Sequence, residues 1–142
     1  MYDIILIMFN KNKCFGIQNE ITMLPLIRDF FNDQTIAKTP NVRCPFDYES
    51  EDTLYELKTR NNCYNRYPDT IFPCKKFTYL PNKNKILIFS FTDGNYYIPY
   101  DPVLFDTFYK EKKQYRFDRG PIDQAAEYVN IPVTSLIKME RV

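Results

Sequence analysis

The fold is decided by residues 75–113, which read KKFTYLPNKNKILIFSFTDGNYYIPYDPVLFDTFYKEKK. Two runs rich in β-forming residues, 85–92 and 95–100, flank the dipeptide Asp93-Gly94. This pattern is the strongest short-range signal for a β-hairpin, because a type I′ turn needs positive φ at both central positions and these two residues tolerate it. The stretch therefore predicts an antiparallel hairpin with Asp93 and Gly94 at its tip.

The same stretch predicts a strand before the hairpin and a helix after it. Residues 77–79 are aromatic and β-branched, so they favour a third strand of a β-meander. The Asp101 side chain can accept hydrogen bonds from the free amides of a first helical turn, and Pro102 needs no amide partner there. We expect a helix over about 102–112.

Weaker signals predict the remaining elements. The apolar run 3–9 and residues 14–17 favour an N-terminal hairpin. Apolar residues at helical spacing predict a helix over 23–32 with Thr22 as its cap, and Ser50 followed by acidic residues predicts a second helix over 50–60.

The other segments predict loops and a helical end. Most of 32–73 is interrupted by prolines and reads as long loops, which are typical of contact surfaces. The segment 121–142 reads as helical. The expected fold is α+β, with an antiparallel meander, an N-terminal hairpin and three or four short helices, in a single domain over 1–142.

Composition indicates an ordinary folded domain without a membrane span. The chain has 142 residues, 44% of them hydrophobic, and its longest apolar run is too short to cross a bilayer. With no export signal, the four cysteines favour a reducing, intracellular location, such as the cytoplasm, a virus factory or a virion. Abundant Asn, Lys, Ile, Tyr and Phe have A/T-rich codons and suggest a viral or plasmid genome.

The absence of histidine and the small number of glycines exclude several kinds of catalytic and binding site. The sequence contains no histidine, which excludes catalytic Ser-His-Asp and Cys-His pairs and histidine-ligated zinc. With 3 glycines, a phosphate-cradling loop or dinucleotide fingerprint cannot be built. Any enzyme mechanism would rest on carboxylates, lysine, tyrosine or cysteine.

Two sets of residues are candidate metal ligands. The acidic residues between 47 and 56 offer oxygen ligands for magnesium, with Asp47 and Glu51 as the pair to test, although an acidic run usually faces solvent. The four cysteines offer thiolates to zinc, but their wide spacing favours buried free thiols. No cofactor is predicted.

A basic run with interleaved aromatic residues is the best nucleic-acid candidate, because cations neutralise phosphates and aromatic rings stack on unpaired bases. An exposed helix end is the simpler interpretation. The residues of this run are Lys110, Lys112, Lys113, Tyr115, Arg116 and Arg119.

The C-terminal run offers a second nucleic-acid candidate. A small residue, Ala126, is followed four residues later by Asn130 at the turn position, with apolar residues on either side. This pattern resembles the helix-turn-helix of excisionase-like and MerR-like DNA-binding proteins. The resemblance implies that the major groove is contacted by Thr134, Ser135, Lys138 and Arg141.

The sequence as a whole favours a non-catalytic interaction protein, a small subunit of a larger assembly that acts by protein–protein contact. The first alternative is a nucleic-acid-binding accessory factor that uses 110–119 and the C-terminal segment 122–140. The second alternative is a carboxylate- and magnesium-dependent enzyme.

Overall fold

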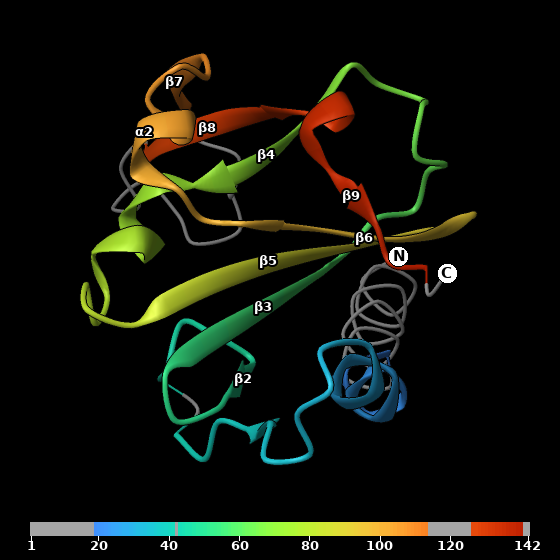
Figure 1. Ribbon diagram of the computed structural model, residues 1–142. Helices are drawn as coiled ribbons and strands as arrows, with labels where there is room; N and C mark the ends of the chain where they lie inside the picture. The colour runs from blue at the N-terminus through green and yellow to red at the C-terminus, as the bar shows by residue number, and fades with distance from the viewer. Residues whose placement is uncertain (1–18, 42, 114–125, 141–142) are drawn as a thin grey trace, which may run out of the picture.

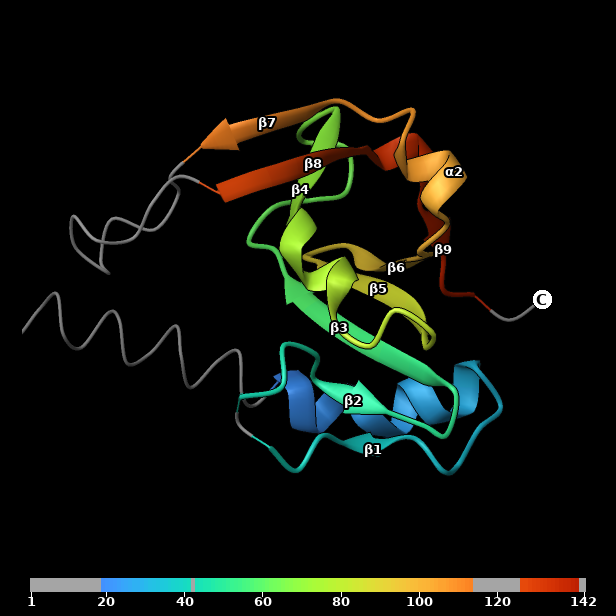
Figure 2. The ribbon, with the colours of Figure 1, turned by 90° about the vertical axis from the view of Figure 1, so that its left-hand side faces the viewer.

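The computed structural model describes residues 19–41, 43–113 and 126–140. These residues form a six-stranded sheet in the order β1-β2-β3-β5-β6-β9 and a three-stranded sheet in the order β4-β8-β7. The larger sheet lies in the middle, with a helix over 19–30 on one face and the smaller sheet on the other (Figures 1 and 2). The α+β class is therefore confirmed.

The elements are short, and most are strands. The strands are β1 (Ala37–Lys38), β2 (Tyr48–Glu49), β3 (Thr53–Thr59), β4 (Asp69–Pro73), β5 (Asn84–Phe91), β6 (Gly94–Pro99), β7 (Lys110–Lys113), β8 (Ala126–Pro132) and β9 (Ile137–Lys138). Besides the helix over 19–30, the helical elements are α2 (Pro102–Phe105) and the 3-10 turns η1 (Cys74–Thr78) and η3 (Val133–Ser135).

The predicted hairpin is confirmed, but its tip is displaced by one residue. Strands β5 and β6 pair antiparallel, and Phe91 lies opposite Gly94. Thr92 and Asp93 therefore form the turn, and neither has a positive φ. The Asp93 carboxylate accepts a hydrogen bond from the amide of Tyr64 at 2.8 Å, which ties the turn to a distant loop.

The predicted helix over 50–60 is wrong, because this segment is strand β3. It lies between β2, which is antiparallel to it, and β5, which is parallel to it. Residues Thr53–Leu57 are all buried, as expected for a strand covered on both faces. The prediction that most of 32–73 forms loops is also wrong, because four strands lie within this segment.

The predicted strand over 77–79 is also wrong, because it overlaps the 3-10 turn η1. The predicted helix at 102 begins as expected, with the Asp101 side chain accepting a hydrogen bond from the Val103 amide at 3.0 Å. It ends at Phe105 rather than near 112, because 110–113 pair with β8 as strand β7. The helix over 23–32 is confirmed in place, but it already includes residue 19, so Thr22 lies inside it and is not its cap.

The predicted helical C-terminus is wrong over its described part. Residues 126–132 form strand β8, and Val129 and Ile131 are both fully buried. This two-residue period matches a strand, and Val129 lies opposite Phe72 of β4. The number of helices predicted is therefore not confirmed. The predicted hairpin of 3–9 with 14–17 lies outside the described residues, and the single domain stays a prediction.

Two apolar cores hold the layers together. One lies between the sheets and includes Leu54, Phe72 and Phe89. The other lies between the larger sheet and the helix and includes Ile27 and Ile88. None of the helices in the described part of the chain has the length and apolar character needed to span a membrane.

Candidate functional site

Strand β3 carries two charged side chains on the face that looks toward the smaller sheet. Leu54 belongs to the core between the sheets, whereas Tyr55 and Leu57 belong to the core under the helix. Because successive side chains of a strand alternate between its faces, Glu56 and Lys58 lie on the same face as Leu54. Both therefore extend into the layer between the two sheets.

The register between strands β2 and β3 places Asp47 beside Glu56. Tyr48 pairs with Tyr55, so the next position along the ladder places Asp47 opposite Glu56. The Asp47 carboxylate, rather than a main-chain carbonyl, accepts the hydrogen bond of the Leu57 amide at 2.8 Å. This bond holds the two carboxyl groups next to each other.

The close approach of these carboxyl groups changes how Asp47 titrates. Its pKa is raised from 3.8 to about 7, first by burial and then by a hydrogen bond with Glu56 and the repulsion between the two groups. The hydrogen bond from Leu57 opposes this rise. Near neutral pH the Asp47 carboxyl group is therefore partly protonated.

A third carboxyl group, that of Glu20 in the helix, completes a row of three. Its pKa is raised mainly by burial, and its hydrogen bond with Lys38 opposes the rise. The two outer carboxylates each have a lysine partner: Lys38 binds Glu20 at 2.5 Å, and Lys76 of η1 forms an ion pair with Glu56. Asp47, in the middle, has no such cation among the residues that the structure describes.

Lys58 is the cation next to this row that is not neutralised. Its ammonium forms no hydrogen bond or ion pair with another described residue, and it lies 5.8 Å from the centroid of the Phe72 ring. Burial lowers the pKa of Lys58, Glu56 opposes that change, and Lys76 adds to it by repulsion. A partly buried amine of this kind is available for an anionic ligand or for proton transfer.

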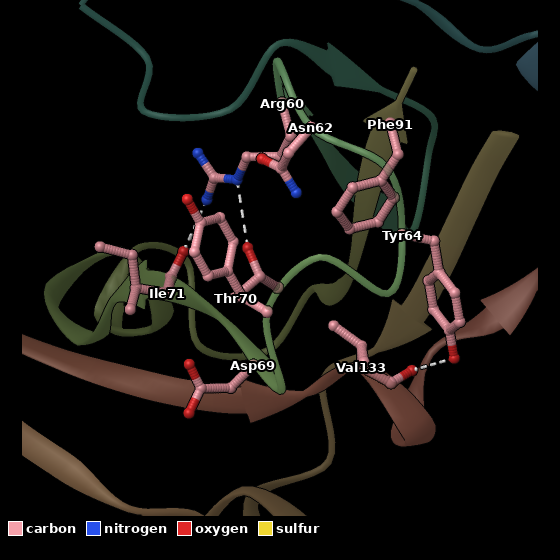
Figure 3. Close-up of a pocket in the computed structure, with 9 residues that line it drawn as sticks. Arg60, Asn62, Tyr64, Asp69, Thr70, Ile71, Phe91 and Val133 are labelled. Carbon is pink, nitrogen blue, oxygen red and sulfur yellow. Dashed lines mark hydrogen bonds between the residues drawn. The ribbon is translucent and has the colours of Figure 1, made fainter. Parts of the chain in front are cut away.

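A cavity continues the site beyond Lys58. Arg60 follows on the same face, where its guanidinium donates to the Thr70 hydroxyl at 3.1 Å and to the Ile71 carbonyl at 2.8 Å (Figure 3). The cavity has a volume of about 160 Å³, and Tyr64 and Tyr67 are among the residues that line it. The cavity thus combines aromatic rings with a cation, and none of Glu20, Asp47, Glu56 and Lys58 lines it.

The chemistry of this row suits a hard divalent cation bound through few protein ligands. Magnesium is usually held by one or two carboxylates together with water and substrate phosphates. Asp47 and Glu56 form such a pair. In the described ranges, no group of three or more Asp, Glu, Cys or His side chains is arranged to hold a metal ion.

The acidic run predicted as a magnesium site is divided by the structure. Asp47 and Glu56 come together, whereas Glu51 and Asp52 are exposed in the bend between β2 and β3. The Asp52 carboxylate accepts a hydrogen bond from the Thr53 hydroxyl at 3.0 Å. Asp47 therefore lies next to Glu56 and not next to Glu51, the partner that the sequence suggested.

Part of the predicted nucleic-acid surface is described, and its basic side chains have acidic neighbours. Lys110 lies 3.9 Å from Asp106, and Lys113 lies 3.5 Å from Glu111. Lys112 is exposed. Tyr115, Arg116 and Arg119 lie outside the described residues, so nucleic-acid binding by 110–119 stays a prediction.

The C-terminal candidates do not form a recognition helix. Thr134 and Ser135 lie in η3, and Lys138 lies in β9, where it binds Glu140 at 2.7 Å. Strand β7 runs alongside β8, with Lys113 opposite Ala126 at the end of β8 far from η3 and Lys110 opposite Val129 near the middle of that strand (Figure 2). Arg141 lies outside the described residues. The helix-turn-helix resemblance is therefore wrong.

Sequence reasoning missed Lys58 because it read 50–60 as a helix. Residues two apart point to different sides of a helix but to the same side of a strand. The spacing of Glu56 and Lys58 would have indicated a shared face, had the β-branched and aromatic residues of 53–59 been read as a strand.

Comparison with protein-family models, with curated proteins and with solved structures found no match to this chain.

Proposed function

We propose that the protein is a divalent-metal-dependent hydrolase of phosphate esters. The single observation that carries the proposal is the placement of Asp47 and Glu56 side by side, with the unpaired ammonium of Lys58 on the same strand face as Glu56. This develops the enzyme alternative that the acidic run suggested. It departs from the non-catalytic function that the sequence favoured.

Each side chain has a role in this proposal. Asp47 and Glu56 would hold the metal ion, which would supply Lewis-acid chemistry at the phosphate. Lys58 contacts a non-bridging phosphate oxygen and stabilises the negative charge that develops as water attacks. No imidazole is needed for any of these roles.

Phosphodiesters of nucleic acid are the first substrates to test. Lys58 and Arg60 lie along one strand face, and the cavity beside Arg60 presents Tyr64 and Tyr67. Basic side chains that neutralise phosphates and aromatic rings that stack on unpaired bases are the two features that bind single-stranded nucleic acid.

The test is hydrolysis of bis(p-nitrophenyl) phosphate and of labelled single-stranded and duplex DNA and RNA, with Mg²⁺, with Mn²⁺ and with EDTA. We expect metal-dependent turnover that falls at least about 100-fold in Asp47→Asn, Glu56→Gln and Lys58→Met. Glu51→Gln removes a nearby exposed carboxylate and serves as the control with unchanged turnover. Turnover that is absent, or that is equal in all four variants, would contradict the proposal.

A second candidate is the protein-contact function predicted from the sequence. Among the described strands, β7 lies at one edge of the smaller sheet, and the segment before it exposes large apolar side chains, with Val103 at 78% and Tyr109 at 65%. An edge strand next to apolar side chains is suited to pairing with another chain. Affinity purification from the native source should then recover a partner, whereas a stable monomer without partners would count against it.

A further inference from the structure

The cavity beside Arg60 has a lining that indicates a ligand independently of the row of carboxylates. It lies where β3 and β5 end, because Arg60 follows β3, Phe91 ends β5 and Thr70 of β4 faces them (Figure 3). We propose that this cavity binds a small aromatic oxyanion, with the ring between the apolar side chains and a carboxylate or phosphate group against the Arg60 guanidinium. The inference does not need Asp47 or Glu56, so it stands whether or not the chain hydrolyses phosphate esters.

Arg60 brings a positive charge to the cavity wall without an acidic partner. A guanidinium has five N–H donors, and two of them are used by the Thr70 hydroxyl and the Ile71 carbonyl. The other N–H groups have no hydrogen-bond partner, and Arg60 has no ion pair, among the described residues. Burial lowers the pKa of Arg60, yet a guanidinium stays charged at physiological pH. An oxyanion would neutralise this charge and accept the remaining N–H groups.

Asp69 also lines the cavity but does not neutralise Arg60. Neighbouring side chains of a strand alternate, so Asp69 and Thr70 lie on different faces of β4. The Asp69 carboxylate lies 3.5 Å from the Asn130 side-chain amide. In the view of Figure 3 it lies on the other side of Thr70 from the guanidinium. The positive charge of Arg60 therefore remains available to a ligand.

The aromatic wall of the cavity is held in place by contacts within the protein. The Tyr64 ring stacks on Tyr96 with centroids 4.1 Å apart, and its hydroxyl donates to the Val133 carbonyl at 2.7 Å. Phe91 packs edge-on against Tyr64, with centroids 5.8 Å apart. A wall that is already ordered lowers the entropic cost of binding. The volume of about 160 Å³ is close to that of an engineered apolar cavity of about 150 Å³ that binds benzene, so one ring fits.

The entrance of the cavity lies at Tyr67, which is 54% exposed and is the most exposed of the lining residues. Tyr67 belongs to the loop between β3 and β4, so its side chain can move without breaking a strand ladder. The Arg66 guanidinium lies 5.6 Å from the centroid of the Tyr67 ring. A second cation at the entrance favours the approach of an anion.

The experiment titrates the full chain, labelled with ¹⁵N, with benzoate and follows the amide chemical shifts by NMR. We expect a Kd on the order of 1 mM, with the largest shifts among the amides of residues 60–71. Benzamide has the same ring without the charge and should bind at least about 10-fold more weakly. Acetate lacks the ring and should also bind at least about 10-fold more weakly. Phenyl phosphate distinguishes the two oxyanions, since the tighter of it and benzoate identifies the group that Arg60 prefers.

Three variants locate the site. Arg60→Met should weaken benzoate binding at least about 10-fold, because the charge is gone. Tyr67→Ala removes an exposed ring, keeps the contacts of Arg60 and should weaken binding several-fold, which gives a result even if Arg60→Met does not fold. Arg43→Met removes an exposed arginine that does not line the cavity and should leave Kd unchanged.

Three results would overturn the inference. The first is the absence of amide shifts with benzoate and with phenyl phosphate at about 20 mM, well above the expected Kd. The second is equal affinity for benzoate and benzamide, which would show that the guanidinium does not select the ligand. The third is a folded Arg60→Met or Tyr67→Ala variant that binds benzoate as the wild type does, since the ligand would then lie elsewhere.

Discussion

The two faces of strand β3 contrast sharply. On the helix side, Tyr55 and Leu57 join an apolar core with Ile27 and Ile88, and these side chains make the layer stable. On the side of the smaller sheet, Leu54 is followed by the charged side chains of Glu56, which is buried, and Lys58, which is half-buried.

Burying these charged side chains costs free energy. A buried charge is tolerated only when it is paired or changes its protonation. Glu56 is paired with Lys76, Asp47 has a raised pKa, and Lys58 has a lowered one. One strand thus stabilises the fold with one face and holds strained ionisable groups with the other, which is the pattern that functional sites tend to show.

The largest expected effect on stability comes from a substitution in the apolar core on the helix side of β3. Ile88→Ala removes a fully buried side chain between the larger sheet and the helix. We expect the free energy of unfolding to fall by about 2–5 kcal/mol, from lost burial and from the cavity left behind. Urea denaturation checks this, and a loss below about 1 kcal/mol would show that this face repacks easily.

The next effect is a pH dependence that belongs to the polar face. The folded pKa of Asp47, about 7, lies above its ordinary value of 3.8, so the folded protein binds this proton more tightly. The stabilisation is complete below about pH 4 and is lost as the pH rises through about 7.

We therefore expect Asp47 to cost the metal-free protein roughly 2–4 kcal/mol of stability between pH 4 and pH 8. Urea titrations in EDTA at several pH values measure this slope. Asp47→Asn should flatten it, and an unchanged slope in that variant would assign the dependence to other groups.

A smaller and opposite effect is expected at Lys58. Lys58→Met replaces a partly buried, unpaired ammonium with an apolar side chain of similar length, so the free energy of unfolding should rise by about 1 kcal/mol. The same variant is expected to lose turnover. Thermal and urea denaturation give the stability, and a clear loss of stability would indicate that the ammonium has a structural partner.

The smallest effect is expected at the exposed end of the carboxylate row. The Lys38 side chain is 42% exposed where it binds Glu20, and surface ion pairs contribute little. Lys38→Met should lower the free energy of unfolding by less than about 0.5 kcal/mol. A loss similar to that of Ile88→Ala would mean that the whole row acts as one structural unit.

Local signals predicted part of this fold. The hairpin of β5 and β6, the helix near 23–32 and the Asp101 cap depend on neighbouring residues, so they could be read directly. The segments that form β3 and β8 were predicted as helices, and this was wrong. A short run of polar and apolar residues fits the spacing of a helix as well as that of a strand, and only pairing with neighbouring strands distinguishes the two. Because β3 was predicted as a helix, the sequence did not indicate that Glu56 and Lys58 lie on the same face.

The sequence by itself determined the α+β class, the absence of imidazole chemistry and the presence of an acidic segment around Asp47. Only the tertiary structure decided which acids meet. Pairing β3 between β2 and β5 put Glu56 opposite Asp47, and packing η1 over that face brought Lys76 to Glu56. The physical reason is that proximity across a sheet depends on strand register and layer packing, which residues far apart in the chain set together.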